Sequence, residues 1–225
     1  MELIALLGKG GTAKTTSTAS LGHAFARRGQ RVVLVDLDSQ ASLSDWLVGE
    51  RDDQPMVEDV LMGRDSWGNV LVDVAPNLRL APTMNFALKE VDNHIEGLKR
   101  QRELVVDAAL RTLPDADIVL IDTPRGLDTN IALNVFEAMS KALVASEPST
   151  MSLTANREIV LAIREFEEAR DTSLLLGVLP TRYTHTSLSK MALDAMGENQ
   201  GLRVFTPVRA TVRASEAVTL DSLLF

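Results

Sequence analysis

Residues 8–16, GKGGTAKTT, indicate the fold because a predicted strand precedes them and a predicted helix follows. Before them, Leu3–Leu7 has the apolar run of a short buried strand, and after them Lys14–Arg28 has the spacing of a helix. Glycines let the backbone wrap a phosphate closely, and the start of the helix adds partial positive charge. A glycine-rich turn that only caps a helix is the alternative. The strand before the loop and Lys-Thr-Thr after it favour a phosphate-binding loop, in which Lys14 reaches the β- and γ-phosphates and the Thr15 hydroxyl binds Mg²⁺.

Apolar strands alternate with helical segments along the rest of the chain. Arg31–Asp36 (RVVLVD) and Asp117–Asp122 (DIVLID) are apolar on consecutive positions, which is typical of parallel strands buried on both faces. Further strands are expected at Asn69–Val74, Asn77–Leu80, Ala142–Ser146, Leu174–Leu179 and Arg203–Phe205. Helices are expected at Phe86–Leu113 with a break near Gly97, at Ser152–Arg170 and at Ser187–Gly197. Glu50–Gly68 is the least regular part, and we expect it to be a surface insertion. The pattern predicts an α/β fold of one domain over residues 1–225, with a mostly parallel sheet and helices on both faces.

The composition limits the classes of protein and of site. The 225 residues carry a net charge of -8, include no cysteine and contain no apolar run near the ~20 residues of a membrane span. The lack of cysteine excludes disulfides, thiolate metal sites and cluster-bearing proteins with a related phosphate loop. Met1 stands directly before a strand without a basic or cleavable leader, so we expect a cytoplasmic protein. The acidic balance opposes a dedicated nucleic-acid binder, so any DNA contact has to come from a local basic patch.

Acidic residues follow two of the apolar strands. Asp36 and Asp38 lie in the segment DLDSQ at residues 36–40, and Asp122 ends the strand DIVLID before Thr123-Pro124. The carboxyl ends of parallel strands face the ligand crevice of such sheets. An apolar strand that ends in aspartate indicates a Walker B element, which holds Mg²⁺, commonly through water. An acidic cap on a strand end is the structural alternative.

The loop resembles the deviant Walker A motif, Lys-Gly-Gly-x-Gly-Lys-Thr-Thr/Ser, of the ParA/MinD superfamily of P-loop ATPases, and in particular of the ParA-type partition ATPases. The resemblance implies ATP and Mg²⁺ as ligands. It also implies catalytic roles for Lys14 and for Lys9, which in relatives crosses a dimer interface to the nucleotide on the partner. The implied nucleotide contacts are Gly10, Gly11, Thr12, Ala13, Lys14, Thr15 and Thr16. Ala13 departs from the family's glycine, and its methyl group is tolerable at negative φ and costly at positive φ.

The acidic segments resemble parts of the same family. DLDSQ is similar to the Asp-x-Asp-Pro-Gln switch I segment, with Ser39 in place of proline. The resemblance implies that Asp38 orients or activates the attacking water and that Asp36 supports the Mg²⁺ shell. The implied metal site is Thr15, Asp36 and Asp122. Pro124–Asp128 corresponds to switch II, where Arg125 replaces a residue that is usually proline or alanine.

The resemblance continues toward the C-terminus. The segments Leu179–Tyr183 and Thr206–Ala217 are similar to ParA stretches that lie near the adenine and the DNA-binding face in relatives. The implied adenine contacts are Thr181, Arg182, Pro207 and Val208. The candidate DNA contacts are Arg182, Lys190, Arg203, Arg209 and Arg213, which would bind phosphates without reading bases. Scattered solvated charges on an acidic protein are the alternative for each of them.

The function that this resemblance implies is a slow ATPase, stimulated by a partner and by DNA. It would form an ATP-dependent nucleotide-sandwich homodimer that binds DNA nonspecifically and associates with the nucleoid. With a ParB-like or other adaptor protein that has a basic N-terminal peptide, it would segregate or position DNA or a large cargo. The chain resembles the shorter ParA forms, without an N-terminal helix-turn-helix domain, and it stops where relatives usually continue into one more helix.

Three alternatives remain open. A MinD-like positioning ATPase would carry a basic amphipathic C-terminal helix, whereas TLDSLLF at residues 219–225 contains no basic residue, so no membrane partner is expected. A biotin- or cobalamin-type synthetase uses the same fold, but no substrate motif is visible. A weakly hydrolysing module that binds nucleotide for a regulatory purpose is favoured by Ala13 and Ser39.

Overall fold

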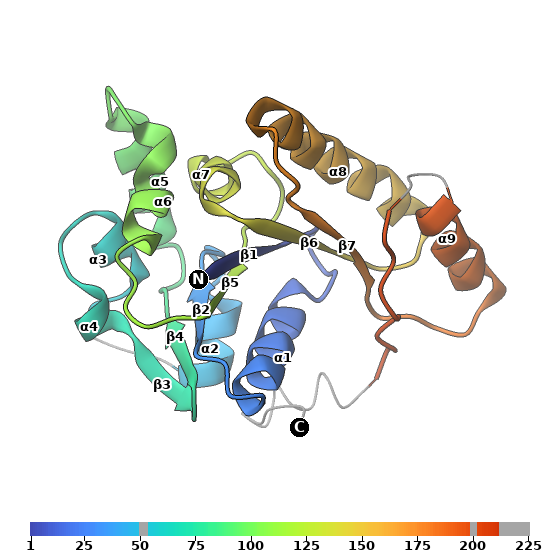
Figure 1. Cartoon of the computed structure of the whole chain (residues 1–225), viewed down its shortest axis with the longest axis horizontal. Helices are drawn as coiled ribbons and strands as arrows, with labels where there is room; N and C mark the ends of the chain where they lie inside the picture. The colour runs from blue at the N-terminus through green and yellow to red at the C-terminus, as the bar shows by residue number, and fades with distance from the viewer. Residues whose placement is uncertain (50–53, 199–201, 212–225) are drawn as a thin grey trace.

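A seven-stranded sheet forms the centre of the computed structural model, which describes residues 1–49, 54–198 and 202–211 (Figure 1). Its strand order is β3-β4-β2-β5-β1-β6-β7. The strands are β1 (Glu2–Leu7), β2 (Val32–Asp36), β3 (Val72–Ala75), β4 (Leu78–Ala81), β5 (Ile118–Asp122), β6 (Lys141–Ser146) and β7 (Leu175–Pro180). All neighbours are parallel except β3 and β4, which form an antiparallel pair at one edge. The predicted mostly parallel α/β fold is confirmed.

Helices cover both faces of this sheet (Figure 1). They are α1 (Lys14–Arg27), α2 (Ser42–Val48), α3 (Val57–Leu61), α4 (Trp67–Val70), α5 (Leu88–Gly97), the 3₁₀ helix η1 (Arg102–Leu104), α6 (Val105–Leu110), α7 (Asn130–Ala138), α8 (Thr150–Arg170) and α9 (Ser187–Glu198). Helices α1 and α2 pack on one face, where Leu34 of β2 is buried. Helices α3 to α8 pack on the other face, where Val33 and Val35 are buried. Because consecutive residues of β2 enter two different cores, its sequence is apolar without alternation.

Three sequence-based expectations need correction, and the expected break near Gly97 is confirmed. Asn69 and Val70 belong to α4, so the strand expected from Asn69 begins only at Val72. The Trp67 indole donates to Ala109 O at 3.0 Å, which anchors that helix in the core. The region expected to be an irregular insertion contains α3 and α4, although its residues 50–53 lie outside the described part. The long helical region does break near Gly97, where α5 ends, as expected, but it continues as η1 and α6.

The third correction concerns Arg203–Phe205, which was expected to be a strand and instead makes an isolated bridge to β7. Val178 N donates to Arg203 O at 2.8 Å, and Phe205 N donates to Val178 O at 2.9 Å. Regular pairing is interrupted after this bridge because Pro180 and Pro207 have no N–H to donate. The contact between the two segments resumes where Val208 N donates to Pro180 O at 2.8 Å. The close approach requires Gly177, since a β-carbon there would lie 2.3 Å from Arg203 O.

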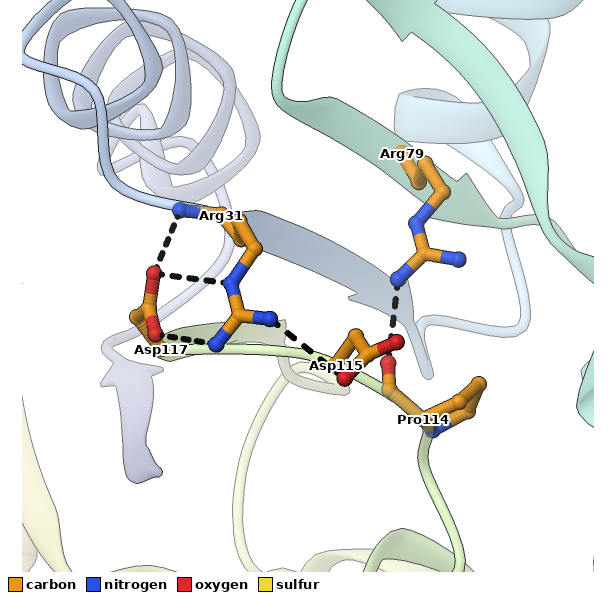
Figure 2. A network of polar contacts seen from close by, with 5 residues as sticks. All are labelled: Arg31, Arg79, Pro114, Asp115 and Asp117. Carbon is orange, nitrogen blue, oxygen red and sulfur yellow. Dashed lines mark hydrogen bonds and ion pairs between the residues drawn. The ribbon is translucent and has the colours of Figure 1, made fainter.

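A polar network fixes the starts of β2 and β5 (Figure 2). Arg31 donates from Nε and Nη2 to the two carboxylate oxygens of Asp117 at 3.2 and 2.7 Å, and its backbone N–H donates to the same carboxylate at 2.9 Å. These hydrogen bonds lower the pKa of Asp117 to about 2, and the bond from the Arg31 side chain has the largest effect. Arg79 adds a bond to Pro114 O at 3.0 Å. Strands β2 and β5 therefore pair in register along their whole length, from Val32 opposite Ile118 to Asp36 opposite Asp122.

Candidate phosphate site

The loop between β1 and α1 is held by a hydrogen bond within itself, and its residues 9–11 are exposed to solvent. Thr12 Oγ1 donates to Lys9 O at 2.8 Å, so the turn is held by its own side chain. Gly8 has φ 154°, and a β-carbon there would lie 2.5 Å from Ala145 O, so only glycine fits between the loop and β6. Gly11 has φ 83°, and nothing lies within 4 Å of the position where its β-carbon would stand. The loop thus leaves space over Gly11 in which a ligand can approach the backbone.

Lys14 stands under this loop, at the start of α1. Its side chain is buried, and its Nζ donates to Gly8 O at 3.0 Å and to Lys9 O at 3.4 Å. Burial lowers the pKa of Lys14, while the negative charges of Asp122 and Asp38 act to raise it. The ammonium group is therefore held against the loop, and the carboxylates of Asp122 and Asp38 are near enough to act on its charge.

Ala13 has the conformation that the sequence analysis identified as costly. Its φ is 57° and its ψ is 34°, which is the left-handed region. A residue with a β-carbon costs about 1–2 kcal/mol there, whereas glycine does not. The conformation is imposed by the start of α1, since Ser17 N donates to Ala13 O at 2.9 Å. The departure from glycine at position 13 therefore carries a structural cost.

We expect Ala13→Gly to raise the free energy of unfolding by about 1 kcal/mol, because it removes strain from a left-handed position. Urea unfolding with an unchanged slope would measure this as a higher midpoint. The matched control is Ala24→Gly in the exposed middle of α1, which should instead lower stability by about 1 kcal/mol. A loss of stability in both variants would contradict the assignment of strain to Ala13.

Asp122 and Asp36 are fully buried side by side at the carboxyl ends of β5 and β2. Asp36 Oδ2 accepts hydrogen bonds from Ser44 N at 2.9 Å and Ser44 Oγ at 2.7 Å, and burial raises the pKa of Asp36 to about 6. Neither oxygen of Asp122 has a hydrogen-bond partner within the described residues. Burial first and then the charge of Asp36 raise the pKa of Asp122 to about 8. A contact with the Thr15 hydroxyl, which falls short of hydrogen-bond geometry, and the charge of Lys14 act to lower it.

This unpartnered carboxylate fits a cation site. A buried carboxylate without partners is costly, and an oxygen-seeking cation such as Mg²⁺ removes the cost. In the described part of the chain, no three histidine, aspartate or glutamate side chains converge on one point as a complete cage. Mg²⁺ commonly takes one or two protein oxygens and completes its shell with water and phosphate. Asp122 and the Thr15 hydroxyl are the groups that could hold it, with Asp36 behind them.

Asp38 lies in a turn beside this pair. It is buried, its Oδ1 accepts from Gln40 N at 3.0 Å, and its backbone oxygen accepts from Ala41 N at 2.8 Å. The turn is supported from a distant segment, because Phe86 N donates to Ser39 O at 2.9 Å. The carboxylate of Asp38 is thus fixed near Lys14, where it can accept a proton or a hydrogen bond.

Ser44 and Thr83 are site residues that sequence reasoning missed. Ser44 Oγ donates to Asp36 and accepts from Thr83 N at 2.9 Å, and Thr83 Oγ1 donates to Glu58 Oε2 at 3.0 Å. All four side chains are buried. This chain of bonds connects the end of β2 to α3. No local signal reveals it, because its partners lie 39 and 25 residues apart in the sequence.

The residues expected near the adenine gather at the end of β7. Thr181 Oγ1 donates to Thr12 O at 2.8 Å, and Arg182 Nη1 donates to Gly11 O at 3.3 Å. Val208 N donates to Pro180 O at 2.8 Å, which brings the Pro207-Val208 segment alongside. The structure therefore unites Thr181 and Arg182 with the loop and places Val208, half exposed, next to that strand end.

The candidate DNA contacts have mixed surroundings. Lys190 is exposed on α9, and Arg209 is exposed after the bridge to Tyr183. Arg203 stacks its guanidinium on the Phe205 ring, 4.6 Å from the ring centre. Arg182 is engaged with the loop, and Arg213 lies outside the described residues. No helix among the described residues has the length and apolarity to cross a bilayer.

Comparisons with known proteins agree with this geometry. A family model of an AAA domain, AAA_31, matches residues 1–176. The chain is 31% identical over 180 residues to the septum site-determining protein MinD of Synechocystis sp., covering 79% of this chain and 64% of that protein. It is 29% identical over 216 residues to the chromosome partitioning protein ParA of Caulobacter vibrioides, covering 93% and 80%. The chain spans 64%, 46% and 58% of the length of the first three curated relatives, all of the MinD type.

Solved structures show the same architecture. Cobyrinic acid a,c-diamide synthase from Mycobacterium smegmatis, with a bound ATP analogue and magnesium, is 31% identical and superimposes with a TM-score of 0.85, covering 94% of this chain and 88% of that one. A complex of an McdA variant from Cyanothece with ATP has a TM-score of 0.88 at 22% identity, covering 100% and 89%. The second likeness bears on the fold alone.

Proposed function

The chain belongs to the ParA/MinD superfamily of P-loop ATPases, and we propose that it binds ATP with Mg²⁺ in the loop at residues 8–16 and slowly hydrolyses the terminal phosphate. The observation that carries the proposal is the unpartnered, buried carboxylate of Asp122 beside the buried ammonium of Lys14. The Asp122 carboxylate suits a cation, and the Lys14 ammonium suits an anion. The glycine loop above them leaves room for phosphates. A site of this composition fits a metal-bound polyphosphate.

Mg-ATP supplies the reacting phosphoryl group together with the cation that spreads its charge. Lys14 donates its N–H groups to phosphate oxygens. In the structure these N–H groups donate to Gly8 O and Lys9 O. Thr15 and Asp122 hold the cation, and Asp36, fixed by Ser44, supports them. Asp38 orients the attacking water and accepts a hydrogen bond from it, since its backbone is locked in the turn at residues 38–41.

The proposed active form is a homodimer that closes around nucleotide. Lys9 is exposed on the outer side of the loop, while Lys14 is buried beneath it. An exposed cation next to a phosphate site can reach the nucleotide of a second copy, as an arginine supplied in trans does. Because Lys9 then acts only in the closed dimer, a single subunit hydrolyses ATP poorly.

The ATP-bound dimer is proposed to bind DNA without sequence preference and, with an adaptor protein, to position DNA or a large cargo in the cytoplasm, associated with the nucleoid. Because dimerisation also doubles the acidic net charge of -8, DNA binding requires that the basic side chains of the two copies gather on one face of the dimer. The side chains proposed for this face are Arg182, Lys190, Arg203, Arg209 and Arg213. The proposed adaptor is ParB-like or another protein with a basic N-terminal peptide.

We expect DNA binding only with ATP and at low salt, because contacts with phosphates release counterions and weaken steeply between about 50 and 200 mM salt. An electrophoretic mobility shift with ATP, with ADP and without nucleotide measures this. Lys14→Ala serves as the control that cannot respond to ATP, so it should give no shift under any condition. A shift that is insensitive to nucleotide, or none at low salt with ATP, would refute the DNA proposal.

A MinD-like positioning ATPase is a second candidate, favoured by the likeness to MinD of Synechocystis sp.. It predicts ATP-dependent binding to anionic vesicles in place of DNA. A nucleotide-binding regulatory module is a third, favoured by the strained Ala13. Phosphate release with and without DNA and the adaptor's N-terminal peptide distinguishes that module from a stimulated ATPase, since the module hydrolyses weakly and neither addition raises its rate.

A further inference from the structure

Arg125 lies directly on the phosphate loop, although the sequence marked it only as a departure from the family's switch II. A β-carbon built on Gly10 would stand 3.1 Å from Cδ of Arg125, 3.6 Å from its Nε and 3.7 Å from its Nη1. The side chain therefore runs across the bare backbone of Gly10. A β-carbon at position 10 would require Cδ of Arg125 to shift by a few tenths of an ångström, so glycine allows the closest approach of this side chain to the loop.

The guanidinium of Arg125 has no hydrogen bond or ion pair within the described residues, and its residue is exposed. Its positive charge is one of the causes that lower the pKa of Lys14. The carboxylates of Asp122 and Asp38 also act on Lys14, and more strongly than Arg125 does. An exposed guanidinium that lies against the loop and has no protein acceptor among the described residues can bind an anion held by that loop.

The position of Arg125 in the chain points to the end of the site where the reaction occurs. It follows Asp122 by three residues, with Pro124 before it and Gly126, at φ 87°, after it. Asp122, which ends β5, is one of the groups proposed for the metal, so the segment that carries Arg125 leaves the sheet at the metal end of the site. From there the arginine side chain lies across Gly10 of the loop.

We propose that Arg125 binds the terminal phosphate of the nucleotide held in its own subunit, as a guanidinium supplied in cis that acts in addition to Lys9 from the partner. The inference rests on the proposed ATP site. A planar guanidinium can donate two parallel hydrogen bonds to phosphate oxygens, which a lysine cannot, and such charge-assisted bonds are the stronger ones. Arg125 then contacts ATP through a phosphate that ADP lacks, so the conformation of switch II depends on whether the third phosphate is present.

The test compares the affinities for a non-hydrolysable ATP analogue and for ADP, both with Mg²⁺, by isothermal titration calorimetry. Arg125→Gln should weaken binding of the analogue by about tenfold or more and that of ADP by less than about twofold. Arg125→Lys should give an intermediate loss for the analogue, because it keeps the charge and loses the fork. The matched control is Arg27→Gln, the same charge change at the opposite end of α1, roughly 20 Å away at 1.5 Å per residue, and it should leave both affinities unchanged.

The possible failures are distinguishable. If the wild-type protein binds neither nucleotide, the proposed ATP site and this inference both fall. If the wild type binds both and Arg125→Gln leaves the ratio of the two affinities unchanged, only the inference is overturned. An equal loss for ADP and the ATP analogue also overturns it, because the side chain would then be acting on the loop and not on the terminal phosphate.

Discussion

Lys14→Ala is expected to abolish ATP binding and to leave the fold intact. The Lys14 ammonium is buried under the loop and donates to two of its carbonyl oxygens, so no other side chain can take its place. Each charge-assisted bond to a phosphate contributes about 1.5–3 kcal/mol, so the loss of two or more should weaken binding by at least about a hundredfold. Isothermal titration calorimetry with Mg²⁺ and a non-hydrolysable analogue measures it.

The control for Lys14→Ala is Lys99→Ala, an exposed lysine outside the loop, which should bind as the wild type does. Urea unfolding of both variants separates lost binding from lost folding. Affinity of Lys14→Ala within about threefold of the wild type, with the fold intact, would show that the loop does not hold the phosphates through this residue.

The second large effect is a loss of turnover with binding retained. Lys9→Ala and Asp38→Ala should each bind ATP nearly normally and hydrolyse it about a hundredfold more slowly or worse, because both groups act on the transition state. Asp38→Asn is the sharper variant, since an amide oxygen can still accept from Gln40 N and preserve the turn. Phosphate release at saturating ATP gives the rate, and normal turnover by Lys9→Ala would refute the sandwich dimer.

The sequence predicted the parts of the fold that are local. The order of strands and helices follows from apolar runs such as RVVLVD and DIVLID, which are buried on both faces of the sheet as their lack of alternation indicated. The phosphate loop and the three aspartates were found because their types and spacing resemble a known motif. The structure adds that β2 and β5 run in register, which puts Asp36 beside Asp122.

The remaining features could not be predicted because they depend on contacts between distant segments. Ser44 is tied to Thr83 and Arg182 to Gly11, and no periodicity records such pairs. Similarly, Arg125 drew attention only as an unusual residue, since its place against Gly10 depends on how switch II folds back on the loop. The pairing of Arg203–Phe205 with β7 is limited to one bridge because Pro180 and Pro207 have no N–H, which an apolar pattern does not record.

Four of the eight non-glycine residues with positive φ in the described part of the chain lie at the site, namely Ala13, Ala41, Phe86 and Arg182. Ala13 is in the loop, Ala41 and Phe86 bond the turn that holds Asp38, and Arg182 bonds Gly11. Each such residue costs of order 1–3 kcal/mol and persists where the surrounding structure over-determines it. The hydrogen bonds that Ala41, Phe86 and Arg182 make at the site help to hold these conformations.

Mixing two inactive variants tests most directly whether each subunit completes the other's site. In a dimer of Lys9→Ala with Asp38→Ala, one of the two sites has its own Asp38 and receives Lys9 from the partner, while the other site lacks both. If half of the dimers are mixed, phosphate release should return to about a quarter of the wild-type rate. A mixture that stays as inactive as either variant alone, although both bind ATP and dimerise, would contradict the shared site.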